Sequence, residues 1–288
     1  MLHRYILHND HVVDYSVKSL SPAQVGLLSG WGVFSTLRVA DGVLFAWDRH
    51  WARIVRDAKA LHVPLPADGE PVRQKLLELV EANQAYNSTL RLNIVRNGGG
   101  MWADPSPERP FDVIAFTADS KDWGEGVKLA YQAEARHAES PLAGTKILSW
   151  AMNLTWLEEA QARGFDEVVL LNERGEVSEC TSANIFIANG NTVYTPPLNS
   201  GCLPGITREV LLGEIHVPGY QVVEKPLMPA DIESADEVFI TSTTRDLLPV
   251  REIEGKKVGC KNQTREVLAN AFREYLKAYV AARKAVVA

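Results

Sequence analysis

Three short stretches of this 288-residue chain combine residue types that can hold an aldehyde, a ring nitrogen and a phosphate. The first contains Lys146, the second contains Glu179, and the third is the run 203–208, which includes a proline and a glycine. A deprotonated lysine amine attacks carbonyl carbons, a carboxylate can hold a protonated ring nitrogen, and backbone amides at a helix start can hold a phosphate. The elements around each stretch decide whether this chemistry is available.

The run 203–208 predicts a turn followed by a helix. Residues 203–205 interrupt regular structure, and Ile206, Val210 and Leu211 then recur at helical spacing. The first amides of such a helix have no partner within it and lie at the positive end of its dipole, so they can bind an anion. Thr207 adds a hydroxyl donor. An ordinary loop followed by a surface helix has the same pattern.

Lys146 follows a turn at 141–144 and precedes an apolar, aromatic run at 147–152. Burial disfavours the charged form of a lysine, and a desolvated amine can form a Schiff base with an aldehyde. A solvated surface charge is the alternative, because the chain has 30 lysine and arginine residues.

Glu179 lies after a turn at 172–175 and before the apolar run 183–187, which predicts a buried strand. A carboxylate at the edge of such a strand is either an exposed turn residue or a buried anion that requires a cationic partner. A protonated pyridine nitrogen is such a partner, and this pairing makes a pyridoxal ring an electron sink.

Lys146, Glu179 within the run Ser-Glu-Cys-Thr-Ser-Ala-Asn-Ile-Phe, and the run 203–208 resemble, in order and spacing, the class IV pyridoxal-phosphate aminotransferases. That family includes branched-chain and D-amino-acid aminotransferases and aminodeoxychorismate lyase. The similarity extends from about Val33 to Val250. It implies bound pyridoxal 5′-phosphate with Lys146 as the catalytic residue, two α/β domains with the cofactor site between them, and a homodimer.

The resemblance also implies which other residues contact the cofactor. Arg53 would reach the phosphate, for which a planar guanidinium is well suited, although it lies away from the apolar stripe of its predicted helix and could be a solvated arginine. Leu203 would pack on the ring and Asn184 would support the site, although both could be core residues. With Lys146 and Glu179, the predicted cofactor contacts are Arg53, Asn184, Leu203, Ile206, Thr207 and Thr243.

Substrate contacts are predicted with less support from the residues. Arg38 and Arg96 stand near predicted strands, where either could clamp a carboxylate or be a surface charge. Ala151 occupies the position, five residues beyond the lysine, where branched-chain enzymes usually have a tyrosine, so their specificity does not transfer directly. The predicted substrate contacts are Phe34, Arg38, Arg96, Trp102 and Thr244.

The function that the resemblance implies is transfer of an amino group to a 2-keto acid, with 2-oxoglutarate as the expected acceptor. The donor would be a branched-chain-like amino acid, a D-amino acid or an amine, and the Lys146 amine would be the proton shuttle. An aminodeoxychorismate lyase that releases pyruvate is an alternative, supported by Thr36 and the run 179–184. A non-catalytic pyridoxal-phosphate-binding protein is another.

Composition limits the remaining classes of function. A hydrophobic share of 46% and a charged share of 23% are ordinary for a globular protein, while the net charge of -6 and the lack of a basic block argue against nucleic acid. Cys180, Cys202 and Cys260 lack the spacing of a disulfide framework or a metal site, so no metal is expected. Without a signal peptide or a membrane-spanning run, the sequence predicts a cytoplasmic protein.

The predicted fold class is α+β, because strands and helices cluster along the chain and do not alternate strictly. A polar, glycine-containing run at 119–126 predicts a linker between an N-terminal domain at 1–118 and a C-terminal domain at 127–288. Helical spacing of apolar residues predicts helices near 47–61, 71–85, 149–163, 207–216 and 263–283.

Overall fold

The computed structural model describes residues 1–18, 20–21, 24–100, 108–259 and 261–287. Contacts along the chain divide it into two compact units. Unit 1 consists of Met1–Lys121, Thr145–Trp150 and Tyr279–Ala288, and unit 2 consists of Asp122–Gly144 and Ala151–Ala278.

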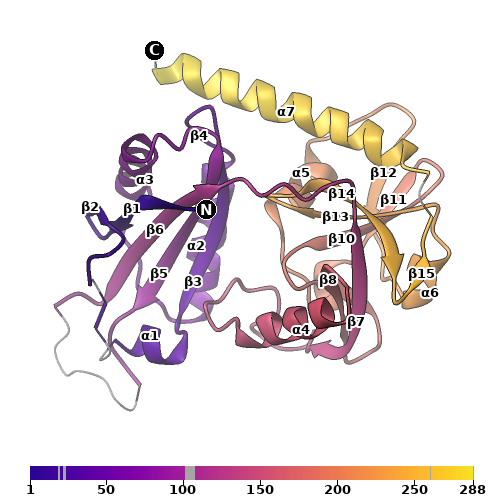
Figure 1. Ribbon diagram of the computed structural model, residues 1–288, viewed down its shortest axis with the longest axis horizontal. Helices are drawn as coiled ribbons and strands as arrows, with labels where there is room; N and C mark the ends of the chain where they lie inside the picture. Colours follow the sequence, from indigo (N-terminus) through magenta and orange to yellow (C-terminus); the bar gives the residue numbers. More distant parts are fainter. Residues whose placement is uncertain (19, 22–23, 101–107, 260, 288) are drawn as a thin grey trace. The chain divides into compact units, whose positions relative to one another are not determined.

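Unit 1 is built on a six-stranded sheet with the order β2-β1-β6-β5-β3-β4, in which neighbouring strands are antiparallel. Figure 1 shows β1, β6, β5 and β3 side by side. The strands are β1 (Leu2–His8), β2 (His11–Asp14), β3 (Gly32–Ala40), β4 (Val43–Leu44), β5 (Ser88–Arg96) and β6 (Phe111–Asp119).

Two amphipathic helices, α2 (Trp47–Ala60) and α3 (Glu70–Ala82), share one hydrophobic core with the sheet of unit 1. Because side chains alternate along a strand, Val33 and Leu37 of β3 enter this core, whereas Phe34 and Thr36 point to the opposite face. A short helix, α1 (Val25–Ser29), precedes β3 and was not predicted from the sequence.

The segment that carries Lys146 pairs with the edge of β3. β4 pairs only with Val39 and Ala40 at the carboxyl end of β3. At the other end of the same strand, Val33 and Ile147 form an antiparallel bridge, and Leu148 donates its N–H to the Gly32 carbonyl at 2.9 Å. These bonds place residues 145–150 in unit 1.

Unit 2 is built on a nine-stranded sheet with the order β12-β11-β10-β13-β14-β7-β8-β9, and β15 pairs with β14. The sheet is mixed, with parallel pairs β11/β12, β14/β7 and β7/β8. Its strands are β7 (Val127–Arg136), β8 (Glu167–Asn172), β9 (Val177–Cys180), β10 (Asn184–Asn189), β11 (Thr192–Thr195), β12 (Gln221–Glu224), β13 (Glu237–Ser242), β14 (Asp246–Ile253) and β15 (Lys256–Lys257).

The helices of unit 2 include α4 (Ala151–Ala162), α5 (Ile206–Gly213) and α6 (Pro229–Glu233), with a 3-10 turn at Leu198–Ser200. The last helix, α7 (Gln263–Val287), extends beyond the predicted end at residue 283. The two mixed α and β units confirm the predicted α+β class.

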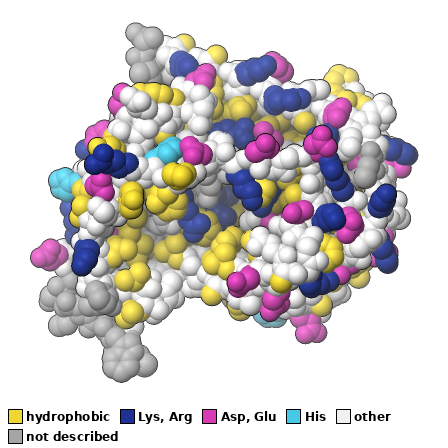
Figure 2. All heavy atoms as spheres, in the orientation of Figure 1, with side chains coloured by type: hydrophobic (Ala, Val, Ile, Leu, Met, Phe, Trp, Pro, Cys, Tyr) yellow, Lys and Arg dark blue, Asp and Glu magenta, His cyan; other side chains and the backbone are white. Residues whose placement is uncertain are grey.

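The surface carries charges of both signs. On the side of the molecule shown in Figure 2, basic and acidic side chains are interspersed. None of the helices in the described part of the chain is long and apolar enough to cross a bilayer.

Candidate functional site

Lys146, in unit 1, is held through both polar groups of its backbone. Its N–H donates to Asp57 Oδ2 at 3.0 Å, and its carbonyl accepts the N–H of Phe34 at 3.0 Å. The side chain reaches the aromatic ring of Phe34, with Nζ at 4.4 Å from the ring centroid. A strand edge and a helix therefore fix the backbone of Lys146.

Arg53 is buried on α2, so it is not the solvated arginine that the sequence left open as an alternative. Its Nη2 donates to Ser35 Oγ at 2.8 Å, and Ser35 Oγ lies 2.8 Å from His50 Nδ1. Ser35 has an exposed fraction of 0%, so this serine on the core face of β3 is a buried hydrogen-bond partner of the guanidinium.

His50 is an uncharged member of this cluster. Burial lowers the pKa of His50 well below its ordinary value, and the positive charges of Arg53 and Lys146 lower it further. Its Nε2 has no hydrogen-bond partner among the residues that the structure describes. A charged imidazole here would add a third cation to a buried site.

Arg91 is a candidate that sequence reasoning missed. It lies on β5 opposite Thr36, and its Cζ is 3.8 Å from the centroid of the Phe34 ring that Lys146 also contacts. Its Nε donates to Asn93 Oδ1 at 3.1 Å, and burial lowers its pKa. Within the described ranges no carboxylate pairs with Arg91, so this half-buried guanidinium can bind a carboxylate of a ligand.

The other predicted substrate residues of unit 1 are placed differently. Phe34 is the ring between Arg91 and Lys146. Arg38 is half-buried farther along the same face of β3. Arg96 donates to the carbonyls of Gly98 and His62, both at 2.6 Å, and its Cζ lies 4.0 Å from the Trp31 ring centroid, so it is largely engaged within unit 1. Trp102 lies outside the described residues.

Glu179, in unit 2, is a buried residue of β9 with two partners. Its Oε1 accepts from Arg136 Nε at 3.0 Å, and its Oε2 accepts from the backbone N–H of Leu203 at 3.0 Å. The buried anion expected from the sequence therefore has a cationic protein partner, Arg136, which the sequence did not indicate.

The predicted turn and helix lie next to Glu179 in unit 2. Gly205 is the N-cap of α5, and no side chain of the described residues caps this helix start, whose first amides have no partner within the helix. Asn184 donates from Nδ2 to the Leu203 carbonyl at 2.9 Å and thus holds the turn. Ile206 and Thr207 are both buried in the first turn of α5.

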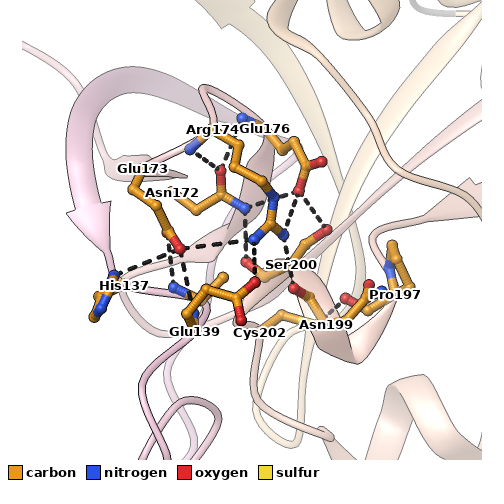
Figure 3. Close-up of polar contacts among 11 residues, drawn as sticks. His137, Glu139, Asn172, Glu173, Arg174, Glu176, Pro197, Asn199, Ser200 and Cys202 are labelled. Atoms are coloured by element: carbon orange, nitrogen blue, oxygen red, sulfur yellow. Dashed lines mark hydrogen bonds and ion pairs between the residues drawn. The ribbon is translucent and has the colours of Figure 1, made fainter.

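A polar cluster fixes the chain that leads into this turn (Figure 3). Arg174 donates to Glu176 at 2.8 Å and to the Asn199 carbonyl at 2.8 Å, while Asn172 donates to the Ser200 carbonyl at 3.2 Å. Ser200 Oγ in turn donates to Glu176 at 3.1 Å. The β8–β9 turn therefore anchors the approach to residue 203.

Thr243 and Thr244 form the turn between β13 and β14, and both are half-buried. Thr244 Oγ1 lies 3.3 Å from Ser242 Oγ. Thr241, which pairs with Asn184 across β13 and β10, has a buried Oγ1 without a hydrogen-bond partner among the described residues. A buried hydroxyl without a partner calls for a ligand or water.

Each unit thus contains groups that fit pyridoxal phosphate. Unit 2 offers a buried carboxylate for a ring nitrogen and, as far as the described residues show, the start of α5 without a side-chain cap and the Thr241 hydroxyl without a partner. Unit 1 offers Lys146 for an aldehyde and Arg53 for a phosphate. No cluster of three or more metal-binding side chains occurs in the part of the chain that the structure describes.

Comparisons with known proteins show which family the chain is similar to. A family model described as "Amino-transferase class IV" matches residues 32–253. The chain is 32% identical over 256 residues to a putative branched-chain-amino-acid aminotransferase of Methanocaldococcus jannaschii, and the match covers 88% of this chain and 89% of the relative. It is 29% identical over 272 residues to a D-alanine aminotransferase of Bacillus licheniformis, with 88% and 90% covered.

A solved structure has the same fold. The branched-chain aminotransferase of the thermophilic archaeon Thermoproteus uzoniensis, solved with norvaline, superposes with a TM-score of 0.84 at 25% identity. The superposition covers 96% of this chain and 96% of that chain.

Proposed function

The chain belongs to the class IV aminotransferases, which use pyridoxal phosphate, and from this premise we propose how its residues divide the work. Lys146 is the catalytic lysine. Glu179 binds the ring nitrogen, and Arg53, Thr207, Thr243 and the amides of Ile206 and Thr207 bind the phosphate. The observation that supports this proposal most strongly is the anchoring of the Lys146 backbone between Asp57 and Phe34.

When bound, pyridoxal phosphate supplies an aldehyde for amino-group exchange and a ring that takes up electrons from the substrate Cα. The chain's own groups then hold and move protons. Lys146 Nζ takes up the proton from the substrate Cα and gives a proton back later in the exchange. Glu179, which accepts hydrogen bonds from Arg136 and from the Leu203 N–H, would bind the protonated ring nitrogen.

Arg91 and Phe34 form the proposed substrate side of unit 1. The guanidinium of Arg91 binds a carboxylate of the substrate, and the Phe34 ring provides an apolar surface next to Lys146. The relatives act on branched-chain amino acids and D-alanine by name, so an apolar amino acid is the proposed donor and a 2-keto acid, with 2-oxoglutarate as the first candidate, is the acceptor. Arg38, Arg96, Trp102 and Thr244 remain proposed contacts around this substrate, with Leu203 and Asn184 next to the cofactor.

No contact in the described residues favours the lyase or the non-catalytic alternative, and the relatives compared above are aminotransferases. The proposal includes a cytoplasmic location and a homodimer. Light scattering of the purified chain tests the dimer directly, because a monomer mass would contradict it.

Borohydride reduction of the loaded enzyme, followed by peptide mass mapping, tests the role of Lys146. We expect the added mass on the peptide that contains Lys146, and none on that peptide in K146A. Replacing the exposed Lys128 (K128A) is the matched control and should leave the label in place. An unlabelled Lys146 in the wild-type chain would contradict the proposal.

Adding an amino donor without a keto acid separates the aminotransferase from the lyase. A transferred amino group stays on the cofactor and changes its absorption spectrum, whereas a lyase releases pyruvate and restores the original spectrum. Both enantiomers of leucine, alanine and glutamate, with a simple arylalkylamine, form the donor set. K146A should lower the rate of the spectral change by roughly 10²- to 10⁴-fold.

A further inference from the structure

The turn that contains Thr243 and Thr244 also contains Arg245, whose side chain is buried. The turn connects β13 to β14 and is closed by the N–H of Arg245, which donates to the Ser242 carbonyl at 3.2 Å. The position of Thr243 in the turn thus depends on where Arg245 is fixed.

The guanidinium of Arg245 connects this turn to the loop that follows β9. Its side chain has an exposed fraction of 6%. Nη1 donates to the Ser182 carbonyl at 3.1 Å, and Nη2 donates to Ser182 Oγ at 2.9 Å and to Glu167 Oε2 at 3.1 Å. Nη1 also lies 3.5 Å from Ser242 Oγ, within the turn itself.

Glu167, on β8, accepts hydrogen bonds from the same loop. Its Oε2 accepts the Ser182 hydroxyl at 2.5 Å, and its Oε1 accepts the Thr181 hydroxyl and the N–H of Val168. The strand that carries Glu179 ends at Cys180, immediately before these two residues. The Glu167–Arg245 pair therefore joins the strand of the proposed ring-nitrogen acid to the turn of the proposed phosphate contact.

Trp123 completes the attachment of the turn. Its indole N–H donates to the Thr244 carbonyl at 3.0 Å, and its ring centroid lies 3.9 Å from Arg245 Cζ. One aromatic residue thus contacts the turn through its backbone and through its arginine. A planar guanidinium can stack on this ring and bind Glu167 and Ser182 at once, which a lysine ammonium cannot do.

We propose that Arg245 is a positioning residue, which together with Glu167 and Trp123 holds Thr243 where it binds the cofactor phosphate. This inference rests on the proposed function, because Thr243 must be a phosphate contact. A role in stability alone explains the arrangement poorly, since a buried ion pair is often no more stabilising than apolar residues of the same size.

The test compares the affinities of the full chain for pyridoxal phosphate and for pyridoxal, which lacks the phosphate. The ratio of the dissociation constant for pyridoxal to that for pyridoxal phosphate measures how much the phosphate contributes to binding. We expect T243V to reduce the preference for pyridoxal phosphate, and R245K and W123F each to reduce it by roughly three- to tenfold. W123F keeps a smaller aromatic ring for stacking and removes the indole N–H, so it serves if R245K folds poorly.

Two further variants make the test specific. R251K, on the same strand β14, changes an exposed arginine paired with Glu125 and should leave the ratio unchanged. In the T243V background, R245K should have no further effect, because it acts through Thr243.

The failures can be told apart. If T243V lowers the ratio but R245K and W123F lower only the free energy of unfolding, the positioning role is overturned and the phosphate contact stands. If T243V leaves the ratio unchanged, both are overturned.

Discussion

The carboxylate of Asp57 accepts the backbone N–H of Lys146 at 3.0 Å, across 89 residues of sequence. Asp57 has an exposed fraction of 1%, and its other oxygen accepts from Arg56 Nε at 2.8 Å. Helix α2 therefore fixes the main chain of the proposed catalytic lysine directly.

Removing this acceptor should destabilise the protein. D57A leaves the Lys146 N–H without its acceptor in a buried place, and we expect the free energy of unfolding to fall by about 1–3 kcal/mol in urea denaturation. D57N keeps an oxygen that can accept the N–H, so its loss should be smaller. Equal losses in D57A and D57N would show that the charge of Asp57, and not the hydrogen bond to Lys146, is what matters.

The sequence predicted the site as three separate stretches because residue type and local spacing are readable along the chain. It could not predict that residues 145–150 pair with β3, since strand pairing between distant segments has no local signal. A division of the chain by contiguous ranges at 119–126 therefore could not assign Lys146 to the unit in which it lies.

The burial of Arg53 and the place of Arg91 had weaker signals that could have been used. Ser35 interrupts the alternation Val33, Leu37, Val39 on the core face of β3, and a polar residue on such a face needs a buried polar partner. On β5, Leu90 and Leu92 enter the core, so Arg91 must point to the face of Phe34. The alternation of side chains along each strand shows which face of the sheet a residue points to. Only the pairing of β3 with β5 shows which residues lie next to each other.

His50 should make stability depend on pH. Its pKa in the folded protein is lowered by burial, whereas it is about 6.5 in the unfolded chain. The unfolded state therefore binds more protons below about pH 6.5, and the stability contributed by neutral His50 is present above that pH and is lost as the pH falls.

Replacing His50 by glutamine should remove this dependence. H50Q should flatten the decrease of unfolding free energy below pH 6.5 by at most about 1.4 kcal/mol per pH unit, measured by urea denaturation at a series of pH values. H216Q changes an exposed histidine and is the matched control. An unchanged slope in H50Q would contradict the prediction.

Arg91 should discriminate between acceptors. Because no carboxylate in the described residues neutralises it, we expect R91M to raise the KM for a dicarboxylic keto acid more than tenfold, and to raise it less for a monocarboxylic one. R91K keeps the charge without the planar fork, so its effect should lie between those of the wild type and R91M. R38M, on the same face but farther along β3, is the comparison variant. A larger effect in R38M than in R91M would move the carboxylate site to Arg38.

Gly205 should be intolerant of any side chain, although its φ of -69° suits every residue. A Cβ at this position would lie 2.1 Å from Asn184 Oδ1, so the amide that holds the Leu203 carbonyl would have to move. We expect G205A to lower the free energy of unfolding by about 1–3 kcal/mol. We also expect it to weaken binding of pyridoxal phosphate, because the first turn of α5 shifts.

G213A is the control for G205A. Gly213 ends the helix that Gly205 precedes, and a Cβ there would have nothing within 4 Å, so G213A should be neutral or stabilising. In the N184A background the obstructing amide is absent, so the added methyl group has space. G205A should therefore lower the free energy of unfolding less in N184A than in the wild type. If G205A behaves like G213A, the turn is not held as tightly as these contacts indicate.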